Sequence, residues 1–185
     1  MKQIKKFLFV AAAVLFTNAS FAQMEKTVMV GGAEMYPSKN IVQNAVNSKD
    51  HTTLVAAVKA AGLVETLQSD GPFTVFAPTN SAFAMLPAGT VDNLLMAENK
   101  PALTNVLTYH VVPGRLNAKD IAKLIKAGNG TAELKTVSGG KLWLMMKGNK
   151  IMLKDEKGGM ATVTIKDVNQ SNGVIHVIDH VVLPK

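Results

Sequence analysis

The chain has 185 residues, a formal net charge of +7 at pH 7 and no cysteine. The lack of cysteine excludes disulfides, thiol nucleophiles, thiolate metal sites and a lipid-modified N-terminal cysteine. The length suits one domain with a core large enough to be stable without cross-links.

The first 22 residues have the pattern of a secretory signal peptide. Three lysines within the first six residues precede an apolar run from Phe7 to Phe16, and Ser20 and Ala22 are small residues before a cleavage site. The run is shorter than the roughly 20 residues of a spanning helix, so a retained anchor is the weaker alternative. We expect cleavage after Ala22 and a secreted or periplasmic protein that does not span a membrane.

Residues 23–40 are weakly patterned and contain the breakers Gly31, Gly32 and Pro37. We expect a loosely attached lead-in there, followed by one domain over residues 41–185. A short helix is expected near Ile41–Val46 at the start of that domain.

The next part of the chain favours helices. Apolar residues at 54, 55, 58 and 61 recur at helical spacing, and Gly62 stands where a helix ends. After a further turn at 63–67, residues 73–76 predict a strand and Thr79 a helix cap. A helix starts near Pro101, with its apolar stripe running to His110, and Val111-Val112 predicts a short strand. Asn117, with Asp120 three residues on, predicts the start of another helix.

Strands dominate after Gly130. Gly148-Asn149 predicts a two-residue hairpin turn between strands 141–147 and 150–154. Further strands are expected over 161–168 and, as a long last strand, 173–183. Helices first and strands afterwards predict an α+β fold.

Three segments together resemble the fasciclin-like domain family: residues 71–83 (GPFTVFAPTNSAF), 107–112 (LTYHVV) and 172–179 (NGVIHVID). The resemblance runs from about residue 41 to 184. The motif residues that carry it, with structural roles expected, are Phe73, Thr74, Phe76, Pro78, Thr79, Asn80, Phe83, Asn172, Gly173, His176 and Asp179.

The resemblance implies helices packed against a wedge of two β-sheets. It also implies a non-enzymatic adhesion module that binds cell-surface or matrix protein or polysaccharide. In animal members a Tyr-His pair and an Asp-Ile pair contribute to integrin binding, and the matching positions are Tyr109, His110, Asp167 and Val168. Val168 stands where the family has Ile, and the prokaryote-like signal peptide implies a cell without integrins.

The Tyr109-His110 pair has two interpretations. It is either a contact surface for a partner, or His110 continues the apolar stripe inward and hydrogen-bonds within the core. The second is favoured because a buried imidazole needs partners. His110→Ala would then destabilise the fold.

No metal, cofactor or catalytic site is predicted. His176 and His180 lie four residues apart on an expected strand, which separates them by roughly 13 Å, too far for one ion. No serine elbow, phosphate-binding glycine loop or calcium loop occurs. The alternative function is a small-molecule or cofactor binder that uses an apolar cleft between helices and sheets.

Lysines gather in the expected hairpin, at positions 141, 147, 150, 154 and 157. They are compatible with an anionic polysaccharide, lipid head groups or nucleic acid, but the favoured interpretation is a solvated edge protected from strand pairing. Trp143 is the one aromatic residue among them, whereas nucleic acid needs several to stack on. We therefore expect no nucleic-acid partner. We also expect the protein to be a monomer.

Overall fold

The computed structural model describes residues 26–185, so the signal-peptide prediction lies outside the described residues. The helices are α1 (Ile41–Ala45), α2 (Thr52–Ala61), α3 (Val64–Gln68), α4 (Asn80–Ala84), α5 (Thr90–Leu95), α6 (Lys100–Tyr109) and α7 (Ala118–Ala127), with 3-10 turns at Lys49–His51 and Ala97–Asn99. The strands are β1 (Val28–Val30), β2 (Ala33–Met35), β3 (Phe73–Pro78), β4 (Val111–Pro113), β5 (Thr131–Lys135), β6 (Lys141–Lys147), β7 (Lys150–Lys154), β8 (Met160–Gln170) and β9 (Gly173–Ile178).

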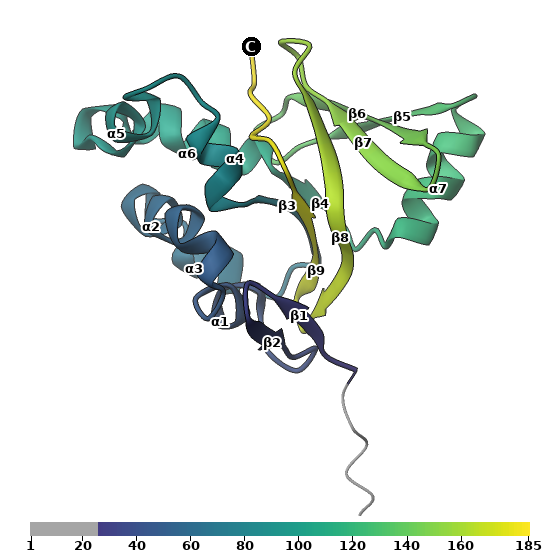
Figure 1. Ribbon diagram of the computed structural model, residues 1–185, viewed down its shortest axis with the longest axis horizontal. Coiled ribbons are helices and arrows are strands. Elements are labelled where there is room, and N and C mark those ends of the chain that lie inside the picture. The colour runs from purple at the N-terminus through teal and green to yellow at the C-terminus, as the bar shows by residue number, and fades with distance from the viewer. Residues whose placement is uncertain (1–25) are drawn as a thin grey trace, which may run out of the picture.

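Seven strands form one bent sheet in the order β4-β3-β9-β8-β7-β6-β5. All neighbours are antiparallel except β3 and β9, which run parallel in the middle of the molecule. The long strand β8 pairs with β7 through residues 160–162 and with β9 through residues 163–170. Because β8 carries two register shifts along the β9 edge, the sheet bends there into a wedge of two halves (Figure 1). The α+β class and the wedge are as predicted.

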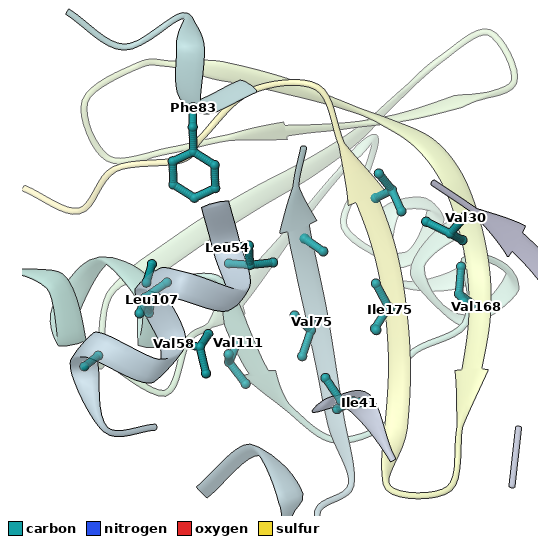
Figure 2. Close-up of a cluster of buried hydrophobic side chains, with 14 of the residues drawn as sticks. Val30, Ile41, Leu54, Val58, Val75, Phe83, Leu107, Val111, Val168 and Ile175 are labelled. Carbon is teal, nitrogen blue, oxygen red and sulfur yellow. The ribbon is translucent and has the colours of Figure 1, made fainter. Parts of the chain in front are cut away.

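The two halves of the sheet enclose separate apolar clusters. The helix-side core lies between helices α1–α6 and strands β3, β4, β8 and β9; its buried members include Leu54, Val58, Val75, Leu107, Val168 and Ile175 (Figure 2). The strand-side core is formed by α7, the end of α6, strands β3 and β4 and strands β5–β9; its buried members include Phe76, Tyr109, Ile121, Leu142, Leu144 and Leu153. Figure 1 shows α7 with β5–β7 on one side and the other helices on the opposite side.

Local chemistry explains several boundaries. Helix α2 ends where Gly62 adopts a left-handed conformation with φ of 73°. Thr79 is the N-cap of helix α4, and its hydroxyl accepts from the Ala82 N–H at 3.2 Å. The Gly148-Asn149 turn joins Lys147 to Lys150, its predicted register partner.

The expectation of a loosely attached lead-in is wrong for its described part, residues 26–40. Residues 28–35 form the β1–β2 hairpin, whose Gly31-Gly32 turn has positive φ at both positions, as a tight hairpin turn requires. Val30 and Met35 are 4% and 3% exposed and belong to the helix-side core. The Asn44 amide, buried in α1, bonds both the N–H and the carbonyl of Tyr36 and so fixes the hairpin to the domain.

The last strand is shorter than predicted, since β9 ends at Ile178 rather than near residue 183. Beyond it the backbone bonds to side chains: the Val182 N–H donates to His110 Nε2 at 3.2 Å, and the Leu183 N–H donates to Asp155 Oδ2 at 2.9 Å. These side-chain acceptors replace a neighbouring strand. His180 therefore lies outside the strand on which its spacing to His176 was calculated.

Candidate functional site

Tyr109 ends α6 and is fully buried in the strand-side core. Its hydroxyl donates to the Lys141 carbonyl at 2.6 Å and accepts from the Glu156 N–H at 3.1 Å. Burial raises the pKa of Tyr109 to about 12, so the hydroxyl remains a donor at neutral pH. A Cβ on Gly140 would lie 2.7 Å from the tyrosine ring, so glycine is required there. Through these two hydrogen bonds Tyr109 connects the start of β6 to the turn after β7.

His110 is 3% exposed and has partners at both ring nitrogens. Nδ1 lies 2.8 Å from the Val106 carbonyl oxygen, and Nε2 lies 3.2 Å from the Val182 nitrogen. A carbonyl only accepts and an amide N–H only donates, so the imidazole is neutral with its proton on Nδ1. Burial lowers the pKa of His110 to about 4, in agreement with a neutral ring. The residue joins the end of α6 to the C-terminal segment.

Asp167 lies in the irregular part of β8, with φ of 60°. Its Oδ1 accepts from the Ala118 N–H at 2.6 Å, at the positive N-terminal end of α7. Asn117, predicted to open this helix, holds the cap position without a side-chain cap bond. The capping carboxylate comes instead from Asp167, far along the sequence. Its neighbour Val168 is 1% exposed in the helix-side core.

His176 is fully buried on β9 and is also a neutral, bonded imidazole. Its Nε2 donates to the Leu116 carbonyl at 2.8 Å, and its Nδ1 accepts from the Asp167 N–H at 3.3 Å. Burial lowers the pKa of His176, and the ring stacks on Phe76 with centroids 5.7 Å apart. Both nitrogens are occupied, so neither is available as a metal ligand. Within residues 26–185 no three His, Asp or Glu side chains gather as a metal site would require.

Asp179 lies just after β9 and closes the β8–β9 pair. Its Oδ1 accepts from the Thr162 N–H at 2.7 Å and lies 2.9 Å from His180 Nδ1. Burial alone would raise the pKa of Asp179, but the bonds from His180 and Thr162 outweigh it and hold the pKa below the usual value. The Asp179–His180 pair is partly exposed, and no hydrogen bond or ion pair within residues 26–185 connects it to a third acidic or imidazole group.

Asn172 connects three segments far apart in the sequence. Its Oδ1 accepts from the Ile41 N–H at 3.1 Å at the start of α1. Its Nδ2 donates to the carbonyls of Leu67 and Ser69, both at 2.8 Å, at the end of α3. Gly173 follows as the first residue of β9, beside Phe73 of β3. The motif at 172–173 therefore fixes helices α1 and α3 to the central strands.

The remaining motif residues also bond or pack within the domain. Thr74 is fully buried, and its hydroxyl donates to the Gly114 carbonyl at 2.7 Å while accepting from the Leu116 N–H. Asn80 Oδ1 accepts from the Thr53 N–H at 3.0 Å and so caps α2 across the fold. Phe83 packs in the helix-side core, and Pro78 ends β3.

Comparisons with known proteins agree with this architecture. The family sequence model of the fasciclin domain matches residues 49–184 of this chain. The chain belongs to the fasciclin domain family. The protein sll1483 of Synechocystis sp. is 47% identical over 166 residues, which cover 90% of this chain and 85% of that protein. The immunogenic protein MPB70 of Mycobacterium bovis is 37% identical over 145 residues, covering 76% of this chain and 66% of that protein.

A solved structure shares the fold. The FAS1 domain pair from the insect cell adhesion molecule fasciclin I matches with a TM-score of 0.71 at 19% identity, covering 80% of this chain and 52% of that one.

In this fasciclin domain the side chains of Tyr109, His110 and Val168 are buried away from solvent. Asp167 is half-buried and bonded. The four predicted contact residues thus present little surface to a partner.

The outer face of β5–β7 is a different kind of surface. Leu142 and Leu144 point inward and are fully buried, so the alternate residues of β6 point outward. We call this outward surface the cationic face; it comprises Thr131, Glu133, Lys135, Lys141, Trp143, Met145, Lys147, Lys150, Met152 and Lys154. Trp143 is half-buried at its centre, directly between Glu133 and Lys154 on the flanking strands. Its Nε1 donates to Glu133 Oε2 at 3.2 Å.

Charge is unevenly divided along the fasciclin domain. Residues 115–185 hold twelve basic and six acidic side chains, whereas residues 23–114 hold five basic and seven acidic. Lys141 pairs with Glu133 at 2.9 Å, but among the described residues Lys147, Lys150 and Lys154 have no ion-pair partner. Lys147 and Lys150 lie directly opposite each other, an arrangement that destabilises a strand pair. The sequence pattern placed these lysines and Trp143 in one hairpin, and the fold shows that they share one face of the sheet.

No helix among residues 26–185 is long and apolar enough to cross a membrane.

Proposed function

We propose that this protein is a secreted or periplasmic, non-enzymatic adhesion module that binds an anionic polysaccharide through the cationic face. The observation that carries the proposal is the group of unpaired lysines around Trp143 on a regular, outward sheet surface. Two opposed lysines repel each other and lower the stability of the strand pair. A bound polyanion would neutralise them, and the relief of this repulsion would favour binding.

The chemistry of the face favours a sugar polymer. A half-exposed indole ring offers a flat apolar surface to the apolar side of a sugar ring, and Trp is a frequent binding anchor. The bond from Trp143 Nε1 to Glu133 fixes the ring's orientation. Lys154, beside the ring on β7, and Lys147 and Lys150, further along the same hairpin, would meet carboxylates or sulfates repeated along the polymer. A single aromatic residue is too few for a nucleic acid to stack along.

The buried motif residues support this surface from behind. Tyr109 holds the Lys141 carbonyl and the Glu156 N–H, at the base of β6 and in the turn beside Trp143. We infer that Tyr109 and His110, like Asp167 and Val168, affect adhesion through the shape of the domain rather than by direct contact. The fold shared with part of a cell adhesion molecule is consistent with this role.

The test is binding of the purified protein to polygalacturonate, with neutral dextran as the control polymer. We expect saturable binding to polygalacturonate that weakens as salt rises, because salt screens exposed charges. Trp143→Ala should weaken binding about tenfold or more, and the double variant Lys147→Gln/Lys150→Gln several-fold.

The matched control removes the same charge from α7, as Lys119→Gln/Lys126→Gln, where both side chains are exposed. It should leave binding nearly unchanged. Equal binding to dextran, or an equal loss in the α7 control, would contradict a defined site on the cationic face.

A further inference from the structure

A narrow cavity of about 90 Å³ lies in the helix-side core, between the helices and the sheet. Its walls come from helices α1, α2, α3 and α6 and from strands β3, β4, β8 and β9. Its lining extends along the α2 segment from His51 to Lys59 and on to Leu67, so this small volume is spread over a narrow space. We call this space the α2–α3 groove.

The groove opens beside α3. This five-residue helix buries none of its side chains, and Leu63, Val64 and Leu67 line the groove while only partly buried. Exposed Lys59 and Thr66 lie at its rim. The volume is below the roughly 150 Å³ of an engineered cavity that admits benzene. A ligand longer than a few atoms would therefore lie partly in the open mouth and shift α3 outward.

Charge along the groove is one-sided. Lys59 is the one charged side chain among the described residues that line it, and no acidic residue does. His51 lies at the other end of the α2 segment, 3% exposed, with Nδ1 2.8 Å from Ser48 Oγ. Burial lowers the pKa of His51, so this end is neutral. Eight residues of helical rise separate the two ends, about 12 Å.

We propose that the α2–α3 groove binds the alkyl chain of a free fatty-acid-like amphiphile, with its carboxylate at Lys59 and its tail directed toward His51. The thin shape admits an unbranched chain. The apolar walls, including Val55, Val58 and Phe73, bury it away from water. A lone lysine at the rim, with no acid in the lining, selects an anionic head group over a cationic one. The site is separate from the cationic face and independent of the proposed polysaccharide binding.

The experiment is calorimetric titration of the whole protein with decanoate below the concentration at which it forms micelles. Decanol and decyltrimethylammonium serve as neutral and cationic comparisons. We expect saturable one-to-one binding of decanoate, weaker binding of decanol and weakest binding of the cation. Lys59→Gln should weaken decanoate about two- to fivefold, as expected for an exposed ion pair, and leave decanol unchanged.

Blocking variants test the location. Val55→Phe adds a ring to the groove lining and should weaken decanoate at least tenfold, whereas Ala56→Phe, one residue away and exposed, should not. Leu67→Trp at the mouth is a second blocking variant if Val55→Phe fails to melt cooperatively. No saturable binding, equal affinity for all three head groups, or equal losses in Val55→Phe and Ala56→Phe would overturn the proposal. So would binding seen only to lipid vesicles, which would indicate a membrane surface.

Discussion

The two apolar cores of this domain differ in how completely they close. In the strand-side core, Leu142, Leu144 and Leu153 are each fully buried. Within residues 26–185, two further apolar side chains at its border are only partly buried, compared with twelve at the border of the helix-side core. The helix-side core also contains the α2–α3 groove. Two cores of one domain, built from similar apolar residues, therefore differ: the strand-side core is closed and the helix-side core is open.

Element length explains the difference. Strands β5, β6 and β7 are joined in a fixed register, so each inward side chain meets a partner, and the amphipathic helix α7 covers them with Ile121 and Ile125. On the other side, helices α1, α3, α4 and α5 have only five or six residues. Such helices make less than two turns and contribute few side chains each. Their packing leaves gaps that continuous strands do not.

The largest expected effect is a loss of stability, measured in a matched pair of leucine-to-alanine variants, one in each core. Leu144→Ala, in the closed core, should lower the free energy of unfolding by about 3–5 kcal/mol, because the cavity cannot collapse. Leu67→Ala, at the mouth of the groove, should lower it by about 1 kcal/mol, because the side chain is already partly exposed. Urea unfolding of both variants measures the difference. Similar losses would show that the two cores are equally packed.

The next prediction concerns how acid changes stability through His110, which joins the end of α6 to the C-terminal segment. Its pKa is about 4 in the fold and near the ordinary 6.5 when unfolded. Above pH 6.5 both states are neutral, so pH has no effect through this group. Between pH 6.5 and 4 only the unfolded state binds the proton, so stability falls as pH falls, by about 3 kcal/mol at pH 4.

His51 and His176 act in the same direction, because burial lowers the pKa of each. His110→Gln keeps a donor and an acceptor but does not titrate. Its unfolding free energy should therefore fall less steeply than that of the wild type between pH 7 and 4.5. Parallel curves for the two proteins would show that His110 does not carry this dependence.

A third test adds one methylene group to each core, and the two results should have opposite signs. Val163→Ile, in the strand-side core, should destabilise by about 1 kcal/mol through overpacking. Val55→Ile, in the groove lining, should stabilise by up to about 0.8 kcal/mol, since it buries a methylene group in free space. Thermal melts distinguish these shifts. A loss in both variants would mean that the groove has no room for added atoms.

The smallest effect is expected at Asp167, which links β8 to α7. Asp167→Asn keeps an acceptor for the Ala118 N–H, and asparagine tolerates the positive φ, so mainly the negative charge at the helix end is lost. We expect a loss of about 0.5 kcal/mol in low salt that nearly disappears in 1 M salt. Asp120→Asn, partly exposed in the first turn of the same helix, is the comparison. A salt-independent loss at Asp167 would indicate a steric role instead.

Features set by neighbouring residues were predictable from the sequence. The Gly148-Asn149 turn, the end of α2 at Gly62 and the Thr79 cap each depend on conformations available within a few residues. Gly31-Gly32 forms the same kind of turn, but the strands on either side have only three residues each, too few for an alternating pattern to identify them. What makes this hairpin part of the domain is the burial of Val30 and Met35.

Features set by distant partners were not predictable. Asn117 stands at the start of α7 as its pattern indicates, yet the cap comes from Asp167. The last strand ends early because His110 and Asp155 bond the backbone beyond it. The predicted hairpin of β6 and β7 already places Trp143 with Lys147, Lys150 and Lys154, but the register of β5, which adds Glu133 and Lys135 to the cationic face, was not predictable.

The sequence by itself therefore determined the family, the α+β class, the position of most helices and the hairpin of β6 and β7. These depend on periodicity, turn residues and caps, which act over a few residues. The inward position of His110 was already favoured by its place on the apolar stripe of its helix. The tertiary structure alone decided that Tyr109 and Val168 are buried, that Asp167 caps a distant helix, and that one core is open. Burial and hydrogen bonding at these positions are properties of side chains brought together from 30 or more residues away. No local pattern encodes them, because the free energy of each contact depends on both partners.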